Sequence, residues 1–159
     1  MTLGLKRIFP CSSCGTCRLT RNGSCMLEGD DFPALFKAMR EADLVLIGMP
    51  GDRGAAAPEL KHLLERAGRV AASSDVNLLF RKIGGPLVIV RQRASTHATA
   101  RLLTWFLAQE MVVCGASYGR RATGANAVSV RADEDGEAIA ERFADNLAWL
   151  AEQLAVQKA

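Results

Sequence analysis

Four of the five cysteines in this chain fall within one short stretch. They are Cys11, Cys14, Cys17 and Cys25, spaced as C-x2-C-x2-C-x7-C. Two intervening residues let a loop fold so that neighbouring sulfurs point toward one centre. The insert before Cys25 contains Asn22-Gly23, a strong turn signal that would bring Cys25 back toward the other three. The spacing therefore predicts a set of four sulfur ligands in the loop 11–25.

Three kinds of thiol chemistry are compatible with this spacing. A [4Fe–4S] centre needs four thiolates, and iron–sulfur proteins use the C-x2-C-x2-C rhythm. A structural zinc site also takes four thiolates, usually from two separated C-x2-4-C pairs. Disulfides or free redox thiols are the third option, although the compact triplet is not a typical disulfide framework. The spacing favours one self-contained iron–sulfur cluster, because no second triplet accompanies the first.

The composition indicates a single globular domain. A chain of 159 residues has the typical length of one domain. Of these residues 49% are hydrophobic, which is enough to form a core. A net charge of +3, with arginines scattered and no aromatic residues between them, does not indicate nucleic-acid binding. No apolar signal-peptide region follows Lys6 and Arg7, and no apolar run approaches the ~20 residues that span a bilayer. We expect a cytoplasmic protein that binds neither nucleic acid nor membrane.

Apolar periodicity predicts alternating strands and helices. Continuous apolar runs favour buried strands, and stripes at i, i+3, i+4 and i+7 favour amphipathic helices. The predicted strands are 3–8, 44–49, 87–90 and 111–114, with a short extended piece at 128–130. The predicted helices are 32–41 after an Asp30 or Asp31 cap, 58–67 before Gly68, 95–109 and 134–153. This order predicts a three-layer α/β fold with a parallel sheet.

Two loops follow the carboxyl ends of predicted parallel strands, where ligands bind in open α/β sheets. The first comprises Pro50, Gly51, Asp52, Arg53 and Gly54, and the second contains Arg91, Gln92 and Arg93. An arginine there can hold a phosphate or a nicotinamide nucleotide, or it can be an ordinary solvated side chain. No catalytic triad or carboxylate pair can be recognised from the spacing, so the catalytic residues stay unassigned.

The remaining sulfur and imidazole side chains have ordinary structural interpretations. Cys114 ends a predicted strand and is expected to be a small buried apolar residue. His62 and His97 lie within or near the start of helices, and we expect surface or capping roles for them.

The order of these features resembles the iron–sulfur flavoproteins, a branch of the flavodoxin-like NAD(P)H-dependent FMN reductase superfamily. The resemblance begins with Pro10-Cys11-x2-Cys14-x2-Cys17, then Cys25, then Asp30-Asp31-Phe32 opening a helix. It covers roughly residues 5–155. The other matching segments are Ala42–Leu46 with the Pro50 loop, Leu60-Lys61 with Glu65-Arg66, Arg81–Gly85 leading into Val88–Val90, Met111–Val113, Gly124 and Asp133–Glu137.

The resemblance implies one flavodoxin-like domain over residues 1–159, with FMN next to a [4Fe–4S] cluster held by the four cysteines. It also implies a homo-oligomeric oxidoreductase that passes electrons between the two groups, with NAD(P)H or ferredoxin as its redox partner. A flavin takes two electrons and can release them singly, whereas a cluster carries one at a time. Two alternatives stay open: a zinc-stabilised, non-enzymatic α/β binding module, and a truncated relative that binds a cluster without flavin.

The first βα unit of the family, with its Gly-Ser-rich phosphate loop, has no counterpart here. In a flavodoxin-like sheet of order 2-1-3-4-5 its strand is central. Unpaired backbone groups buried at such a gap would each cost about 1–3 kcal/mol. The chain must close that gap, recruit a strand from a partner, or be a fragment of a longer reading frame. We favour the last and expect an in-frame extension of roughly 30–45 residues upstream of Met1, the length of one βα unit.

A first prediction concerns the flavin. If FMN binds at the strand ends against 50–54 and 91–95, with the cysteine loop alongside, Arg53→Ala or Arg91→Ala should weaken FMN retention, because each removes a cation that can hold the phosphate. Iron content should not change. Bound FMN and iron in each purified variant measure the two effects, and unchanged flavin affinity in both would place the site elsewhere.

Overall fold

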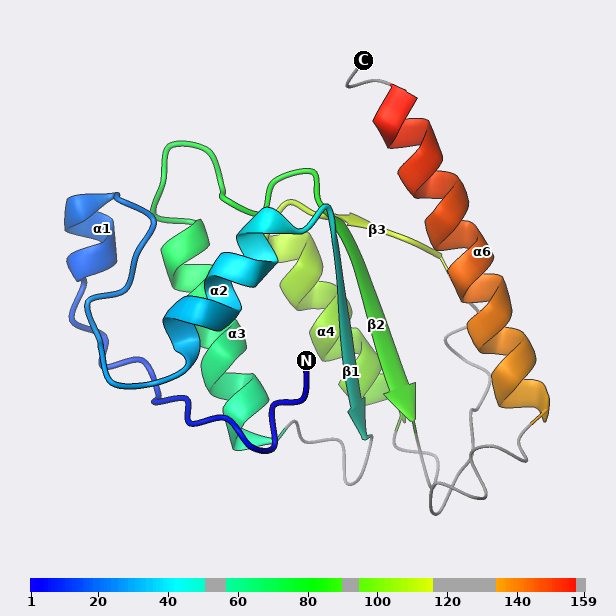
Figure 1. The fold of residues 1–159 in the computed structure, drawn as a ribbon, viewed down its shortest axis with the longest axis horizontal. Helices are drawn as coiled ribbons and strands as arrows, with labels where there is room; N and C mark the ends of the chain where they lie inside the picture. Colours follow the sequence, from blue (N-terminus) through cyan, green and yellow to red (C-terminus); the bar gives the residue numbers. More distant parts are fainter. Residues whose placement is uncertain (51–56, 90–94, 116–133, 157–159) are drawn as a thin grey trace.

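A parallel β-sheet lies at the centre of the fold in the computed structural model, which describes residues 1–50, 57–89, 95–115 and 134–156 (Figure 1). Its strands are β1 (Leu44–Pro50), β2 (Ile83–Ile89) and β3 (Val112–Val113), in the order β1-β2-β3. β1 and β2 pair in parallel from Leu44 opposite Ile83 to Pro50 opposite Ile89. The parallel sheet is confirmed, and β3 is shorter than predicted.

Helices cover both faces of this sheet. The described helices are α1 (Thr16–Thr20), α2 (Phe32–Glu41), α3 (Pro58–Ala71), α4 (Ser95–Ala108) and α6 (Glu134–Val156). The layer of α2, α3 and α4 lies on one side of the sheet and α6 lies on the other (Figure 1). This arrangement confirms the predicted three layers. No described helix has the length and apolarity that crossing a membrane requires.

The core is divided between the two faces of the sheet. The larger part packs against the α2–α4 layer, and the predicted stripe of α2 is buried there as Phe32, Leu35, Phe36 and Met39. The smaller part lies under α6 and contains Ile83, Cys114, Phe143 and Leu147. On the α6 side, Leu46 of β1 and Leu87 of β2 stay 49% and 41% exposed, so α6 covers only part of this face.

Two consecutive glycines of β2 let helices approach both faces. A Cβ on Gly84 would lie 2.6 Å from Phe106 of α4, and one on Gly85 would lie 2.6 Å from Phe143 of α6. Side chains alternate between the two faces of a strand, so each glycine makes room on one side. β2 therefore begins earlier than the predicted strand 87–90, because Ile83–Pro86 is already paired with β1.

Three other expectations need correction or lie outside the described residues. Residues 3–8 form no strand; this segment turns, with the Lys6 amide donating to the Leu3 carbonyl at 2.8 Å. Gly68 lies inside α3 rather than after it, close to Trp105 and Gln109. The extended piece at 128–130 is outside the described residues.

The N-terminal segment is held by the two aspartates before α2. The Arg7 amide donates to Asp31 Oδ2 at 2.8 Å, and the Phe9 amide donates to Asp30 Oδ2 at 2.8 Å. Lys6 Nζ lies 3.1 Å from Asp31 Oδ1. These bonds join the segments that precede and follow the cysteine loop.

The close packing of Gly84 predicts a stability effect. Gly84→Ala should lower the free energy of unfolding by about 1–3 kcal/mol, because the fully buried Phe106 ring has no free space to move into. Gly48→Ala in β1 is the matched control, since its nearest contact would be an ordinary 3.9 Å. Urea unfolding of both variants tests this, and equal stabilities would contradict it.

The bonds to Asp31 predict a dependence of stability on pH. The Arg7 amide, and after it Lys6, lowers the pKa of the Asp31 carboxyl below its usual value. A carboxyl with a lowered folded-state pKa stabilises the fold above its unfolded pKa, and that contribution is lost as pH falls through the folded pKa.

Wild type should therefore be more stable than Asp31→Asn at neutral pH, and the difference should shrink on acidification. Urea midpoints over a pH series measure it. Asp75→Asn is the control, because its ion pair with Arg21 is on the surface. A wild-type advantage over Asp31→Asn that stayed constant with pH would contradict the assignment.

Candidate metal centre

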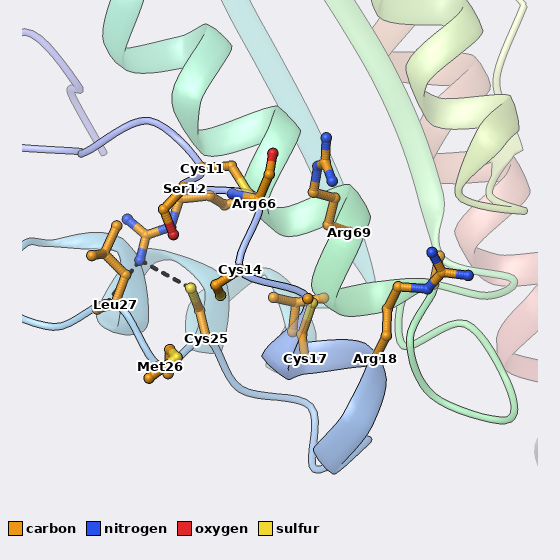
Figure 2. Close-up of a pocket in the computed structure, with 14 residues that line it drawn as sticks. Cys11, Ser12, Cys14, Cys17, Arg18, Cys25, Met26, Leu27, Arg66 and Arg69 are labelled. Atoms are coloured by element: carbon orange, nitrogen blue, oxygen red, sulfur yellow. Dashed lines mark hydrogen bonds between the residues drawn. The ribbon is translucent and has the colours of Figure 1, made fainter.

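The four cysteines of the loop line one cavity of about 420 Å³ (Figure 2). The cavity lies between this loop and the C-terminal half of α3, and three arginines also line it: Arg18, Arg66 and Arg69. Its volume is in the range of cofactor and ligand sites, about 300–1,000 Å³. The predicted gathering of these cysteines is therefore present in the fold, since all four border the same space.

Left-handed backbone conformations shape the loop. Ser13 has φ 54° and Gly15 has φ 76°, and Gly15 is the N-cap residue that starts α1. Cys17 then falls in the first turn of this short helix. Gly23 has φ 69°, and the Ser24 amide donates to Asn22 Oδ1 at 3.0 Å. The chain thus turns at Asn22-Gly23, as predicted, and Cys25 returns to the cavity.

The loop cysteines differ from Cys114 in exposure and acidity. Cys14 is exposed, and hydrogen bonding by Thr16, through its side chain first, lowers the pKa of the Cys14 thiol. The other three loop cysteines are half-buried. Cys114 is buried under α6, and that burial raises the pKa of its thiol. The burial of Cys114 confirms the prediction of a small buried residue. A thiol must ionise in order to bind a metal, and the raised pKa of Cys114 disfavours that ionisation.

No disulfide joins any of the five cysteines, so the thiols are available as ligands. Within the described residues, no three His, Cys, Asp or Glu side chains are close enough to hold a metal ion as they stand. The donor set nevertheless fits a four-thiolate group, because the sulfurs line one cavity together with cations that can balance thiolate charge.

Arg66 is the residue of this site whose role the sequence did not reveal. Its side chain is 1% exposed and forms an ion pair with the fully buried Asp30. Its Nη2 lies 3.4 Å from Cys25 Sγ and 3.0 Å from the Leu27 carbonyl oxygen. The sequence signal that could have identified Arg66 was its position on the apolar face of α3, three residues after Leu63. His62 does not line the cavity; it is half-buried, and its Nδ1 lies 2.9 Å from the Ile8 carbonyl oxygen.

The strands that precede the two loops predicted to bind flavin end at the same edge of the sheet. Pro50 ends β1 opposite Ile89, the last residue of β2. Gly51, Asp52, Arg53, Gly54, Arg91, Gln92 and Arg93 lie outside the described residues. The first of these loops leads to Pro58 at the start of α3, whereas the cysteine cavity lies at the other end of that helix. The position of a flavin relative to the cysteine loop therefore stays a prediction.

Comparison with known proteins agrees with this architecture. The chain is 26% identical over 155 residues to the iron–sulfur flavoprotein MJ1083 of Methanocaldococcus jannaschii, covering 93% of this chain and 77% of the relative. Among solved structures, a WrbA-like flavodoxin from Agrobacterium tumefaciens superposes with TM-score 0.51 at 13% identity, over 70% of this chain and 72% of that one. RosB, solved with a formylated riboflavin phosphate intermediate, superposes with TM-score 0.53 at 18% identity, over 83% and 62%.

The two structural likenesses show a flavodoxin-like fold. The family model of NADPH-dependent FMN reductases matches residues 5–123, which is most of the chain and includes the cysteine loop, β1, β2 and β3. The chain therefore belongs to the NADPH-dependent FMN reductase family.

Proposed function

We propose that this protein is a flavin-dependent oxidoreductase in which Cys11, Cys14, Cys17 and Cys25 hold a [4Fe–4S] cluster that exchanges electrons with FMN. The observation that carries the proposal is the gathering of all four loop cysteines around one cavity with three arginines. A relative that bears the name iron–sulfur flavoprotein supports it. When bound, the cluster supplies a carrier of single electrons.

The residues around the cavity have distinct tasks in this proposal. The four thiolates ligate the iron, and the half-exposed position of the loop leaves one side open to solvent and partners. Arg18 and Arg69 lie at the exposed side of the cavity, where solvent screens their charges. Arg66 closes the buried side of the cavity.

FMN is proposed to bind at the sheet edge that follows Pro50 and Ile89, where residues 50–54 and 91–93 leave the strands. NAD(P)H or ferredoxin is the proposed redox partner, and the protein is proposed to act as a homo-oligomer. Cofactors of this kind perform the electron chemistry themselves, so the protein's contribution is to position them and to tune their potentials.

Anaerobic purification followed by iron, sulfide, zinc and flavin analysis tests the proposal. We expect broad absorption near the blue from a cluster, with resolved flavin bands once FMN is bound. A colourless protein that contains zinc would instead support a zinc-stabilised binding module. Cluster absorption without any flavin affinity would support a relative that carries a cluster alone.

Single substitutions identify the ligands. Replacing Cys11, Cys14, Cys17 or Cys25 with Ala should each remove or convert the cluster, because three thiolates leave one iron without its protein ligand. Cys114→Ala is the control and should keep full iron and sulfide content, since Cys114 lies under α6. Full iron and sulfide in all four loop variants would refute the ligand assignment.

A further inference from the structure

Arg66 is a buried cation that contacts a proposed ligand sulfur. Its guanidinium Nη2 lies 3.4 Å from Cys25 Sγ, and Figure 2 shows this contact as a dashed line. Nη1 lies 3.4 Å from the carbonyl oxygen of Phe9, two residues before Cys11. Arg66 therefore touches the chain on both sides of the cysteine loop.

The surroundings of Arg66 fix its guanidinium rigidly. Asp30 forms an ion pair with Nη1, and the guanidinium carbon lies 4.0 Å from the centre of the Phe32 ring. The Asp30 carboxylate is held in turn by the Phe9 amide at 2.8 Å and the Phe32 amide at 3.2 Å. A guanidinium held on several sides keeps its direction toward the sulfur, which is what a fixed hydrogen-bond donor requires.

One donor of Arg66 is left over. Among the described residues, Arg66 Nε is the buried side-chain nitrogen or oxygen without a hydrogen-bond partner. A buried donor without a partner is unfavourable and is rare in folded proteins. Arg66 also lines the cysteine cavity, and its Nε is a donor that the described contacts leave unused.

We propose that Arg66 is the positioning residue that donates a hydrogen bond to the Cys25 ligand and thereby raises the reduction potential of the cluster. This inference rests on the proposed function. Adding one electron to the cluster breaks no bond and increases the negative charge at the sulfurs. A hydrogen bond and a positive charge next to a ligand sulfur stabilise that reduced state more than the oxidised one.

Arg69 offers a matched control. It lies on the same helix one turn later and lines the same cavity, but its side chain is 52% exposed and paired with Glu65. Its guanidinium points away from Cys25 in Figure 2. Solvent screens an exposed charge, whereas a buried one is screened much less.

The test is a redox titration of anaerobically loaded protein with dithionite, followed by electron paramagnetic resonance. Arg66→Met should lower the equilibrium constant for cluster reduction about tenfold, which is about 59 mV for a one-electron couple. Arg66→Lys keeps the charge and should recover part of the shift. Arg69→Met should change that constant by less than about twofold.

Replacing Asp30 should shift the reduction potential of the cluster in the opposite direction. Asp30→Asn removes the carboxylate that offsets the Arg66 charge, so the potential should rise. The double variant Asp30→Asn/Arg66→Met removes both charges together and leaves no unpaired buried ion, which protects the fold if Arg66→Met alone is unstable. Its potential should lie below that of Asp30→Asn.

The outcomes separate this inference from the function on which it rests. Wild-type protein without iron and sulfide would overturn both. A loaded cluster whose potential is the same in Asp30→Asn and in the double variant would overturn the role of Arg66 alone. Equal shifts for Arg66→Met and Arg69→Met would also overturn it, because they would show a general effect of charge rather than a bond to Cys25.

Discussion

The buried ion pair between Arg66 and Asp30 is the interaction on which the rest of this site depends. Both side chains are almost completely removed from solvent. Breaking such a pair typically costs about 3–5 kcal/mol, because the remaining charge is left buried without compensation. The pair joins the middle of α3 to the segment just before α2, and through the Phe9 amide it also fixes the entry to the cysteine loop.

The loop itself depends on these bonds because it contributes little to the core. No residue of α1 is buried, and Cys17 and Cys25 pack only at the edge of the larger hydrophobic cluster. Segments with few buried apolar contacts open at a lower free energy than the core does. This loop can therefore adjust its sulfurs around a metal group while its two ends stay fixed.

α3 separates two chemical regions of the molecule. Its first residue, Pro58, follows the loop from the edge of the sheet, and Arg69 near its end lines the cysteine cavity. The helical rise between these two residues is about 16 Å. The proposed flavin edge and the cysteine cavity thus lie toward opposite ends of this helix.

Features that depend on neighbours along the chain could be predicted from the sequence. The cysteine spacing, the turn at Asn22-Gly23, the stripe of α2 and the apolar run of β1 are all short-range patterns. Other features arise only when distant segments pack together. Gly84-Gly85 has the composition of a turn, yet parallel pairing with β1 and the approach of helices on both faces make it a strand. Arg66 meets Asp30 across 36 residues, and no local pattern specifies such a contact, because desolvation and packing select partners by position in space.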